Sequence, residues 1–511
     1  MLYWGEMVAK VITIAPIGFD GSIIEVESDA TRSLPSLQIV GLGNKAIEEA
    51  KERVRSSINN SLLEFPKKKI TINLAPAELP KDGAHYDLPI ALAILCVSGQ
   101  IKQEELNGSV FAGELSLDGK LRPIRGAINI AQLAKETGYK RIFLPEANAK
   151  QAGLIKDIEI FGVQSLKQLF LHLKNEKTIK PSQNKPTTKN MDSVLKHPLL
   201  DDIIGQEQAK RALTIAAAGH HNMLLSGSPG AGKTMLAKAL ANLLPDLSPE
   251  EQVAITKIHS IAGKVNDEIL QSRPFRAPHH TASRISIIGG GVHPKPGEIS
   301  LAHTGVLFLD EMPEYPRATL EALRQPLEDK RIDISRTSAH ISYPADFMLI
   351  ATMNPCPCGY FGDKTKECSC TNNQIISYQK KLSGPLLDRI DLIINVSKVP
   401  NDMLLIKDSL SNNQHLVATN SIKKALELQN KRYKSSIIYN ASLSSQDVRK
   451  YANLTNDAKN LLSVAAERLS LSARSYFKVI KVARTIADLS NEAAISTEHI
   501  SEALQYRQPI S

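Results

Sequence analysis

The sequence predicts an α/β protein of more than one domain, and three observations carry this prediction. The chain has 511 residues, too many for a single hydrophobic core. A glycine-rich loop at 227–234 stands between a short apolar strand and a helical pattern, the setting of a phosphate-binding loop. A polar stretch rich in Lys and interrupted by Pro separates this region from an earlier one. We therefore expect an N-terminal α/β domain (1–173), a linker (174–196), a central P-loop α/β domain (197–400) and a helical C-terminal part (401–511).

Composition favours a cytoplasmic protein without a membrane partner. Hydrophobic residues make up 42% and charged residues 23% of the chain, as in soluble globular proteins. The net charge of +9 is compatible with nucleic acid, but also with an ordinary solvated surface. Glu6 and Lys10 interrupt the start of the chain, and the longest apolar run, at 88–99, is too short to span a bilayer. The five cysteines therefore belong in a reducing compartment, where disulfides are rare.

The N-terminal region alternates strand-like and helix-like segments. Apolar and β-branched runs predict strands, and longer amphipathic or apolar runs predict helices. The predicted strands are 11–14, 23–26, 70–74, 141–145 and 158–162, and the predicted helices are 44–59 and 88–97.

The glycine-rich loop predicts an ATP site. It consists of Gly227, Ser228, Pro229, Gly230, Ala231, Gly232, Lys233 and Thr234. The glycines let backbone N–H groups surround phosphates at the positive end of the following helix. Lys233 would place its charge between the β- and γ-phosphates, and the Thr234 hydroxyl would bind Mg²⁺. A purely structural glycine turn is disfavoured, because the pattern is complete and lies between a strand (221–225) and a helix (235–244).

Two later apolar strands end in polar residues that suit the same site. The strand at 305–309 is followed by Asp310 and Glu311; Asp310 would hold Mg²⁺ through water, and Glu311 would orient and deprotonate the attacking water. Many strands end in acidic residues, so this motif gains its meaning from the preceding P-loop. A second strand ends at Asn354, which we expect beside the γ-phosphate.

Arg389, in the segment 382–392, is a candidate arginine finger that acts on the ATP of a neighbouring copy. An ordinary salt bridge at a helix end explains the residue equally well, and sequence alone leaves both interpretations open.

Four cysteines form two C-x-C pairs: Cys356 with Cys358, and Cys368 with Cys370. Four thiolates suit a structural Zn²⁺ site, which would hold the loop after Asn354 in place. The alternative is four unligated thiols. Cys96 lies in the apolar helix and fits plain core packing.

Basic residues in two segments are candidates for DNA contact. The insertion between the P-loop and Asp310 carries Arg273 and Arg276, and an alternating segment at 331–344, which predicts a β-hairpin, carries Arg331 and Arg336. Such elements track a phosphate backbone without reading sequence. The alternative is packing between subunits.

These motifs resemble the AAA+ ATPases, and the chain is identified as a member of the ComM/YifB family of magnesium chelatase-like proteins. The resemblance covers nearly the whole chain, and its blocks are 36–45, 82–92, 274–281, 296–312, 354–359, 382–392 and 471–489. It implies a homo-hexamer that hydrolyses ATP and moves DNA. In the family this activity is associated with branch migration in homologous recombination during natural transformation.

The resemblance also assigns roles to residues outside the P-loop. Arg389 becomes the finger acting in trans, Arg474 becomes the second sensor arginine of a helical lid, and residues 205–206 would lie near the adenine. Lys478 stands where the family pattern leads us to expect Arg, which keeps the charge but loses bidentate binding.

The N-terminal domain resembles the Lon-protease-type domain of the ribosomal-S5-domain-2-like fold. Lon enzymes use a Ser nucleophile and a Lys base. His85 and Ile128 occupy the matching positions here, so the resemblance implies a non-proteolytic scaffold or a DNA-engaging module.

Three functions compete on sequence grounds. The first is a DNA translocase or helicase acting on single-stranded, duplex or branched DNA, with recombination proteins as further partners. The second is a chelatase-type motor that drives metal insertion with partner subunits. The third, an ATP-dependent protease, is disfavoured by His85 and Ile128. The Lon-like domain and the basic hairpin favour the first.

Overall fold

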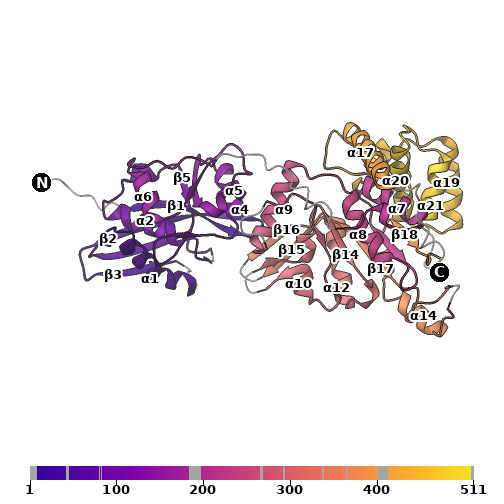
Figure 1. Cartoon of the computed structure of the whole chain (residues 1–511), viewed down its shortest axis with the longest axis horizontal. Helices are drawn as coiled ribbons and strands as arrows, with labels where there is room; N and C mark the ends of the chain where they lie inside the picture. Colours follow the sequence, from indigo (N-terminus) through magenta and orange to yellow (C-terminus); the bar gives the residue numbers. More distant parts are fainter. Residues whose placement is uncertain are drawn as a thin grey trace.

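The computed structural model describes most of the chain as three consecutive parts. The described residues are 8–41, 45–79, 81, 83–182, 197–264, 269–291, 294–336, 339–363, 366–400 and 413–507. An N-terminal α/β unit lies at one end of the long axis, a unit with a parallel sheet lies in the middle, and helices occupy the other end (Figure 1). Much of the predicted linker, residues 183–196, lies outside the described residues.

The N-terminal unit is built on a mixed seven-stranded sheet. Its order is β3-β4-β2-β1-β5-β8-β9; the pairs β1–β2 and β2–β4 are antiparallel and the others parallel. The strands are β1 (Ala9–Ile17), β2 (Asp20–Thr31), β3 (Ser36–Val40), β4 (Lys69–Ala75), β5 (Ser109–Phe111), β8 (Arg141–Pro145) and β9 (Glu159–Val163). The five predicted strands are confirmed. The sequence analysis missed β3, a half-exposed edge strand, and β5, which has three residues.

Helices cover both faces of this sheet, because side chains along each strand alternate between two apolar clusters. Phe143 of β8 joins one cluster, whereas Ile142 and Leu144 join the other. The first face carries α1 (Lys45–Asn60), α2 (Asp87–Val97) and α6 (Leu166–Leu173), and the second carries α4 (Ala127–Glu136) and α5 (Glu146–Ala152). Short elements complete the unit: α3 (Gln103–Leu106), β6 (Glu114–Leu115) and β7 (Leu121–Arg122).

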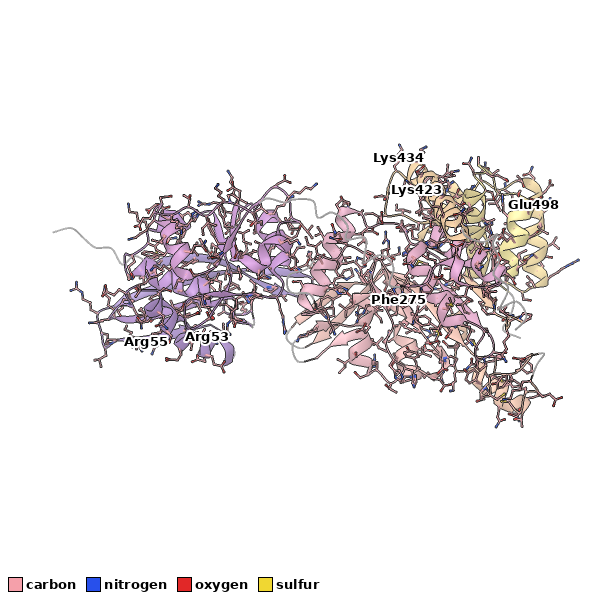
Figure 2. The ribbon with its side chains drawn as sticks, in the orientation of Figure 1. Arg53, Arg55, Phe275, Lys423, Lys434 and Glu498 are labelled. Atoms are coloured by element: carbon pink, nitrogen blue, oxygen red, sulfur yellow. The ribbon has the colours of Figure 1, made fainter. Side chains whose placement is uncertain are left out.

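The middle unit contains a five-stranded sheet in which every neighbouring pair is parallel. Its order is β11-β14-β17-β10-β18. The strands are β11 (Phe275–Arg276), β14 (Val306–Leu309), β17 (Met348–Met353), β10 (Met223–Ser226) and β18 (Leu392–Asn395). The central strands are almost entirely apolar because both faces are buried, and Ser226 and Thr352 are their polar residues. Figure 2 shows Phe275 in the middle of the molecule, where its ring packs against Phe308.

The two faces of this sheet carry different elements. One packs against α7 (Glu207–Gly219) and α8 (Lys233–Leu243), and the other packs against the hairpin of β15 (Arg331–Arg336) and β16 (Ala339–Pro344). The predicted hairpin is confirmed, with Ile334 opposite Ile341. The other elements are η2 (Leu200–Asp202), α9 (Pro249–Ile261), α10 (Arg284–Ile288), β12 (Gly289–Gly290), β13 (Lys295–Pro296), α11 (Glu298–Leu301), η3 (Met312–Glu314), α12 (Arg317–Ala322), α13 (Arg324–Asp329), α14 (Asn372–Gln379) and α15 (Gly384–Leu387).

The C-terminal part is helical, as predicted, but it shares its core with the middle unit. Its elements are α17 (Gln414–Tyr433), η4 (Asn440–Ser442), α18 (Ser445–Tyr451), α19 (Asn456–Arg468), α20 (Ala473–Leu489) and α21 (Thr497–Gln505). Apolar residues of α17 and α20 pack with α7 and α8 in a single cluster. Among the described residues, we find no helix with the length and apolar character needed to cross a membrane.

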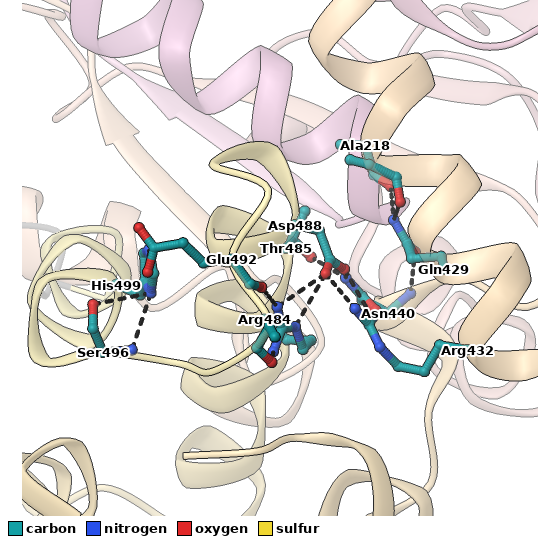
Figure 3. Close-up of polar contacts among 12 residues, drawn as sticks. Ala218, Gln429, Arg432, Asn440, Arg484, Thr485, Asp488, Glu492, Ser496 and His499 are labelled. Carbon is teal, nitrogen blue, oxygen red and sulfur yellow. Dashed lines mark hydrogen bonds and ion pairs between the residues drawn. The ribbon is translucent and has the colours of Figure 1, made fainter. Parts of the chain in front are cut away.

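A buried polar network joins these helices (Figure 3). The fully buried carboxylate of Asp488 accepts hydrogen bonds from Arg432 (2.9 and 2.5 Å), from Arg484 (3.2 Å) and from Asn440 (2.9 Å). Gln429 of α17 donates to the carbonyl of Ala218 in α7 (2.9 Å). The network therefore ties α17, η4 and α20 together and fastens them to the middle unit.

The N-terminal and middle units meet through α4, α9 and the turn between β1 and β2. The N–H of Gly126 donates to Ser260 Oγ (3.0 Å), whose hydroxyl donates to Gln151 (3.1 Å). The ammonium of Lys257 lies 4.0 Å from the centroid of the Phe19 ring. Phe19 also packs against the apolar cluster that contains Ile341 of the hairpin. A β-carbon on the neighbouring Gly18 would overlap the side chain of Ile341, so the N-terminal unit lies directly against the hairpin.

The Asp488 network yields a stability prediction. Asp488→Ala removes the carboxylate that neutralises two arginines, which should cost about 3–5 kcal/mol because a buried charge loses its partner. Hydrogen exchange in α17 and α20 should accelerate well beyond that of the N-terminal sheet. Asp447→Ala, at the exposed cap of α18, is the control and should change exchange far less. Equal protection of α17 and α20 in Asp488→Ala and in the unaltered protein would contradict the role given to this network.

Candidate active site

The P-loop lies at the carboxyl edge of the parallel sheet, between β10 and α8. A β-carbon on Gly227 would overlap the carbonyl of Val396 after β18, so the loop can pass this close to the neighbouring strand only with glycine there. Because the strands are parallel, β14 and β17 end at the same edge. The residues that follow them, Asp310 and Asn354, are therefore brought to the P-loop.

Lys233 joins the P-loop to β17. Its ammonium donates to Asn354 Oδ1 (3.0 Å), to the carbonyl of Ser228 (3.1 Å) and to the carbonyl of Gly227. Burial lowers the pKa of Lys233, and the carboxylates of Asp310 and Glu311 oppose that shift. A cation at the mouth of a P-loop is suited to the negative charge of a polyphosphate.

Asp310 lies between two hydroxyl groups. Thr234 Oγ1 donates to one carboxylate oxygen (3.2 Å) and Thr352 Oγ1 to the other (2.5 Å). Thr352 also accepts the backbone N–H of Glu311 (2.9 Å). Hydroxyl and carboxylate oxygens are ligands that Mg²⁺ prefers, so Thr234 and Asp310 fit this ion.

The sequence analysis did not name Thr352. Its buried hydroxyl orients both acidic residues that follow β14. The available signal was its position two residues before Asn354, since side chains at i and i+2 of a strand share one face.

Glu311 follows Asp310 in a left-handed backbone conformation, with φ of 50°. Such a conformation is uncommon for a residue other than glycine and is often found at functional sites. The side chain is exposed at the edge where the P-loop lies.

Arg389 and Arg474 lie together, but at the opposite edge of the sheet. Arg389 comes just before β18, and the adjacent Asp391 accepts the N–H of Asn222, the residue preceding β10 (2.9 Å). The P-loop starts only after β10, about 13 Å along the strand. In the described part of the chain, neither arginine forms a hydrogen bond or ion pair with the P-loop, Asp310 or Glu311.

A single acidic residue connects the two arginines. Arg474 Nη2 donates to Glu328 Oε1 (2.9 Å), and Arg389 Nη2 donates to the other oxygen of that carboxylate. The two arginines line a cleft of about 480 Å³ between the middle unit and the C-terminal helices.

Lys478, where the resemblance leads us to expect Arg, forms an ion pair with the buried Asp391 (2.8 Å). Although burial alone opposes the charged form, the ammonium of Lys478 and the ring of His221 hold the pKa of Asp391 below its usual range. This pair joins α20 to the start of β18.

The four clustered cysteines converge. Their sulfur atoms all lie within 4.8 Å of one another, with Cys356 Sγ 3.3 Å from Cys358 Sγ and 3.6 Å from Cys368 Sγ. These distances exceed an S–S bond and approach the separation of about 3.8 Å expected for thiolates around a tetrahedral Zn²⁺. Backbone N–H groups donate to three of the sulfurs. The donor set and its geometry fit zinc.

The cysteine loop also rests on the P-loop. A β-carbon on Gly359 would lie 2.7 Å from Pro229 Cδ and 3.8 Å from Asn354 Cγ. The cluster therefore supports the backbone next to Asn354.

The basic candidates separate into two groups. Arg273 is buried and forms a bidentate pair with Glu251 (both 2.8 Å), and Arg276 pairs with Glu298 (2.6 and 2.8 Å). Both guanidinium groups thus have carboxylate partners within the chain, and a DNA contact by either residue stays a prediction. Arg331 is 63% exposed on the hairpin, and the side chain of Arg336 lies outside the described residues.

His85 and Ile128, which the resemblance to Lon proteases aligns with a nucleophile and a base, are both buried. Ile128 is buried in the apolar cluster beneath α4. His85 is buried too, and lines a cavity of about 570 Å³ between the N-terminal and middle units, together with Arg125 and Lys295.

Comparison with known proteins accounts for most of the chain. Residues 199–404 match the family described as magnesium chelatase, subunit ChlI; residues 26–148 match subunit ChlI of Mg-chelatase; and residues 415–507 match its C-terminal family. The chain is 43% identical to YifB of Salmonella typhimurium over 503 residues, covering 98% of this chain and 97% of that protein. It is 41% identical to competence protein ComM of Haemophilus influenzae, with coverage of 98% and 97%. The magnesium-chelatase 67 kDa subunit of Chlorobaculum parvum is 27% identical over 158 residues, which are 30% of this chain and 23% of that protein.

The cysteine geometry predicts one zinc ion per chain. Elemental analysis of protein purified in reducing, chelator-free buffer should return a zinc-to-protein ratio near one, because four converging thiolates bind this ion tightly. Replacing Cys368 and Cys370 by Ser should abolish the signal, whereas Cys96→Ser, outside the cluster, should keep it. A ratio near zero for the unaltered protein would exclude the site.

Proposed function

Because the chain belongs to the magnesium chelatase-like family of the YifB and ComM proteins, we propose that it is a hexameric AAA+ ATPase that moves DNA. Its proposed task is branch migration of recombination intermediates during natural transformation. The relationship to a competence protein supports a competence-related role, and the ATP site supplies the chemistry that drives such movement.

The convergence of Lys233, Thr234, Asp310 and Asn354 at one sheet edge is the observation that carries this proposal. Lys233 binds the β- and γ-phosphates, while Thr234 and Asp310 hold Mg²⁺. When bound, that ion neutralises charge on the phosphate oxygens. Asn354 positions the attacking water, and Glu311 accepts its proton as the oxygen attacks the γ-phosphorus. The bond from that phosphorus to the bridging oxygen breaks as the new bond forms, and ADP and inorganic phosphate leave. The Thr352 hydroxyl holds the carboxylate of Asp310 and the backbone N–H of Glu311 in position.

Arg389 supplies the remaining positive charge in this mechanism, but to another subunit. Its position at the opposite sheet edge argues that it does not reach its own ATP. In a ring, the amino edge of one subunit can face the P-loop edge of the next. Arg389, with Arg474 beside it, then contacts the γ-phosphate of the neighbour, where an arginine stabilises the transition state.

The hairpin of β15 and β16 is our proposed contact with DNA. Ile332 and Ile334 anchor it to the core, while Arg331 faces solvent. Exposed guanidinium groups attract phosphates without reading base sequence. Arg331 and Arg336 are the first candidates for this role. Arg273 and Arg276 rank behind them, because the side chains of these two residues are less exposed than that of Arg331.

The N-terminal unit, proposed to be Lon-like, serves as a scaffold or a DNA-engaging module. The side chains of His85 and Ile128 offer neither the hydroxyl nor the amine that a Lon protease uses. The close approach of Gly18 to Ile341 of the hairpin supports a mechanical role. The alternative function, a chelatase-type motor with partner subunits, has less support, because the relatives that match nearly the whole chain are YifB and ComM proteins, whereas the magnesium-chelatase 67 kDa subunit of Chlorobaculum parvum matches 30% of it.

Mixed assemblies test whether Arg389 acts in trans. Lys233→Ala should abolish nucleotide turnover, and Arg389→Ala should bind ATP but hydrolyse it at least about a thousandfold more slowly, the lower end of the range known for arginine fingers. Mixing the two variants creates interfaces that pair an intact Lys233 with an intact Arg389, so part of the ATPase activity should return. Absence of recovery in rings shown to be mixed would mean that Arg389 acts within its own subunit or not at all.

Charge removal on the hairpin tests the DNA contact. Arg331→Ala combined with Arg336→Ala should weaken binding to single-stranded, duplex and forked DNA alike, and should reduce the slope of log affinity against log salt by about two. The matched control is Arg468→Ala, an exposed arginine on α19, which should leave both quantities unchanged. An unaltered salt slope in the hairpin variant would assign DNA binding to another surface.

A further inference from the structure

Arg389 is fully engaged within its own subunit, although its proposed target lies in another. Its Nε donates to the carbonyl of Arg324 (3.0 Å), its Nη1 to the carbonyl of Pro385 (2.8 Å) and its Nη2 to Glu328. The side chain is only 15% exposed. All three guanidinium nitrogens therefore have an acceptor in their own subunit, so a bidentate contact with a phosphate competes with these acceptors for the same nitrogens.

Glu328 is the acceptor that is best suited to be released. The two carbonyls belong to the backbone of α13 and α15, whereas Glu328 is a side chain that is 48% exposed. A half-exposed carboxylate is a weak anchor, because water competes for both partners. Loss of this contact would leave Nε and Nη1 in place and free Nη2, so the guanidinium would keep its position while it exchanges one partner.

The same carboxylate gathers both arginines. Arg474 comes from α20 in the C-terminal helices, and Arg389 comes from the middle unit, yet both donate to Glu328. Two guanidinium groups repel each other unless an anion lies between them. Glu328 therefore occupies the kind of place that a polyphosphate would take between two arginines.

Three lysines that line the cleft have partners other than Glu328. Lys478 pairs with Asp391 and Lys330 pairs with Asp346, while Lys481 donates to the carbonyl of Ala441. Glu328 is thus the carboxylate that both arginines share within the described residues.

We propose that Glu328 is a competing counter-ion that holds Arg389 and Arg474 in their own subunit until the polyphosphate of a neighbour's ATP displaces it. This inference rests on the proposed function, because it requires Arg389 to act in trans. Glu328 is a positioning residue: it gathers the two arginines at one point and weakens their grip on ATP by competing for the same N–H donors.

Removing the charge of Glu328 without changing its shape tests the proposal. Glu328→Gln in the full chain, assembled with magnesium and DNA, should bind a fluorescent non-hydrolysable ATP analogue about two- to fivefold more tightly, the range set by an exposed ion pair. The KM for ATP should fall by the same factor. The matched control is Asp329→Asn, which removes a neighbouring exposed charge that contacts neither arginine and should leave affinity and KM unchanged.

A second comparison assigns the effect to the arginines. In a chain that carries both Arg389→Ala and Arg474→Ala, Glu328→Gln should no longer alter the affinity for the analogue. Unchanged or weaker binding by Glu328→Gln in the otherwise unaltered chain would overturn the proposal, as would tighter binding that persists without the arginines. If mixed rings recover ATPase activity but Glu328→Gln has no effect on affinity, only this inference fails; if the rings do not recover, the trans role of Arg389 fails first.

Discussion

The parallel direction of the five central strands is the constraint on which the rest of the structure depends. It gathers the P-loop, Asp310 and Asn354 at the carboxyl edge, because β10, β14 and β17 all end there. The same constraint leaves Arg389 and Asp391 at the amino edge, beside the residue that precedes β10. The P-loop and Arg389 of one copy thus lie at opposite edges of the sheet. In the proposed ring, the Arg389 of one copy would complete the phosphate site of its neighbour.

The C-terminal helices depend on the middle unit for their position. They share one apolar cluster with α7 and α8, and the pair of Lys478 and Asp391 adds a buried polar contact. Arg474 lies one turn before Lys478 on α20, so this ion pair also directs Arg474 toward Arg389. A lysine suits the position because its compact ammonium reaches one carboxylate oxygen, whereas a planar guanidinium prefers two.

Two further contacts relate distant parts of the chain to the ATP site. The cysteine loop packs on Pro229 through Gly359, so the order of that loop and the shape of the P-loop depend on each other. Glu328 lies on α13, which leads directly into β15 of the hairpin. The hairpin in turn shares an apolar cluster with Phe19 of the N-terminal unit. The segment formed by α13 and the hairpin therefore connects the partner of the proposed finger, the proposed DNA contact and the N-terminal unit.

The sequence by itself determined those features that adjacent residues encode. The strand–loop–helix order around Lys233, the alternation of Ile332 and Ile334, and the apolar helix at 88–97 are local patterns, and each is present in the structure. Tertiary structure decided which side chains meet. Arg474 donates to Glu328, which is 146 positions away in the chain. Arg273 pairs with Glu251 of α9, and this pairing keeps the Arg273 side chain away from solvent. No local pattern encodes such pairings. They depend on how the elements pack together and on the high free-energy cost of burying a charge without a partner.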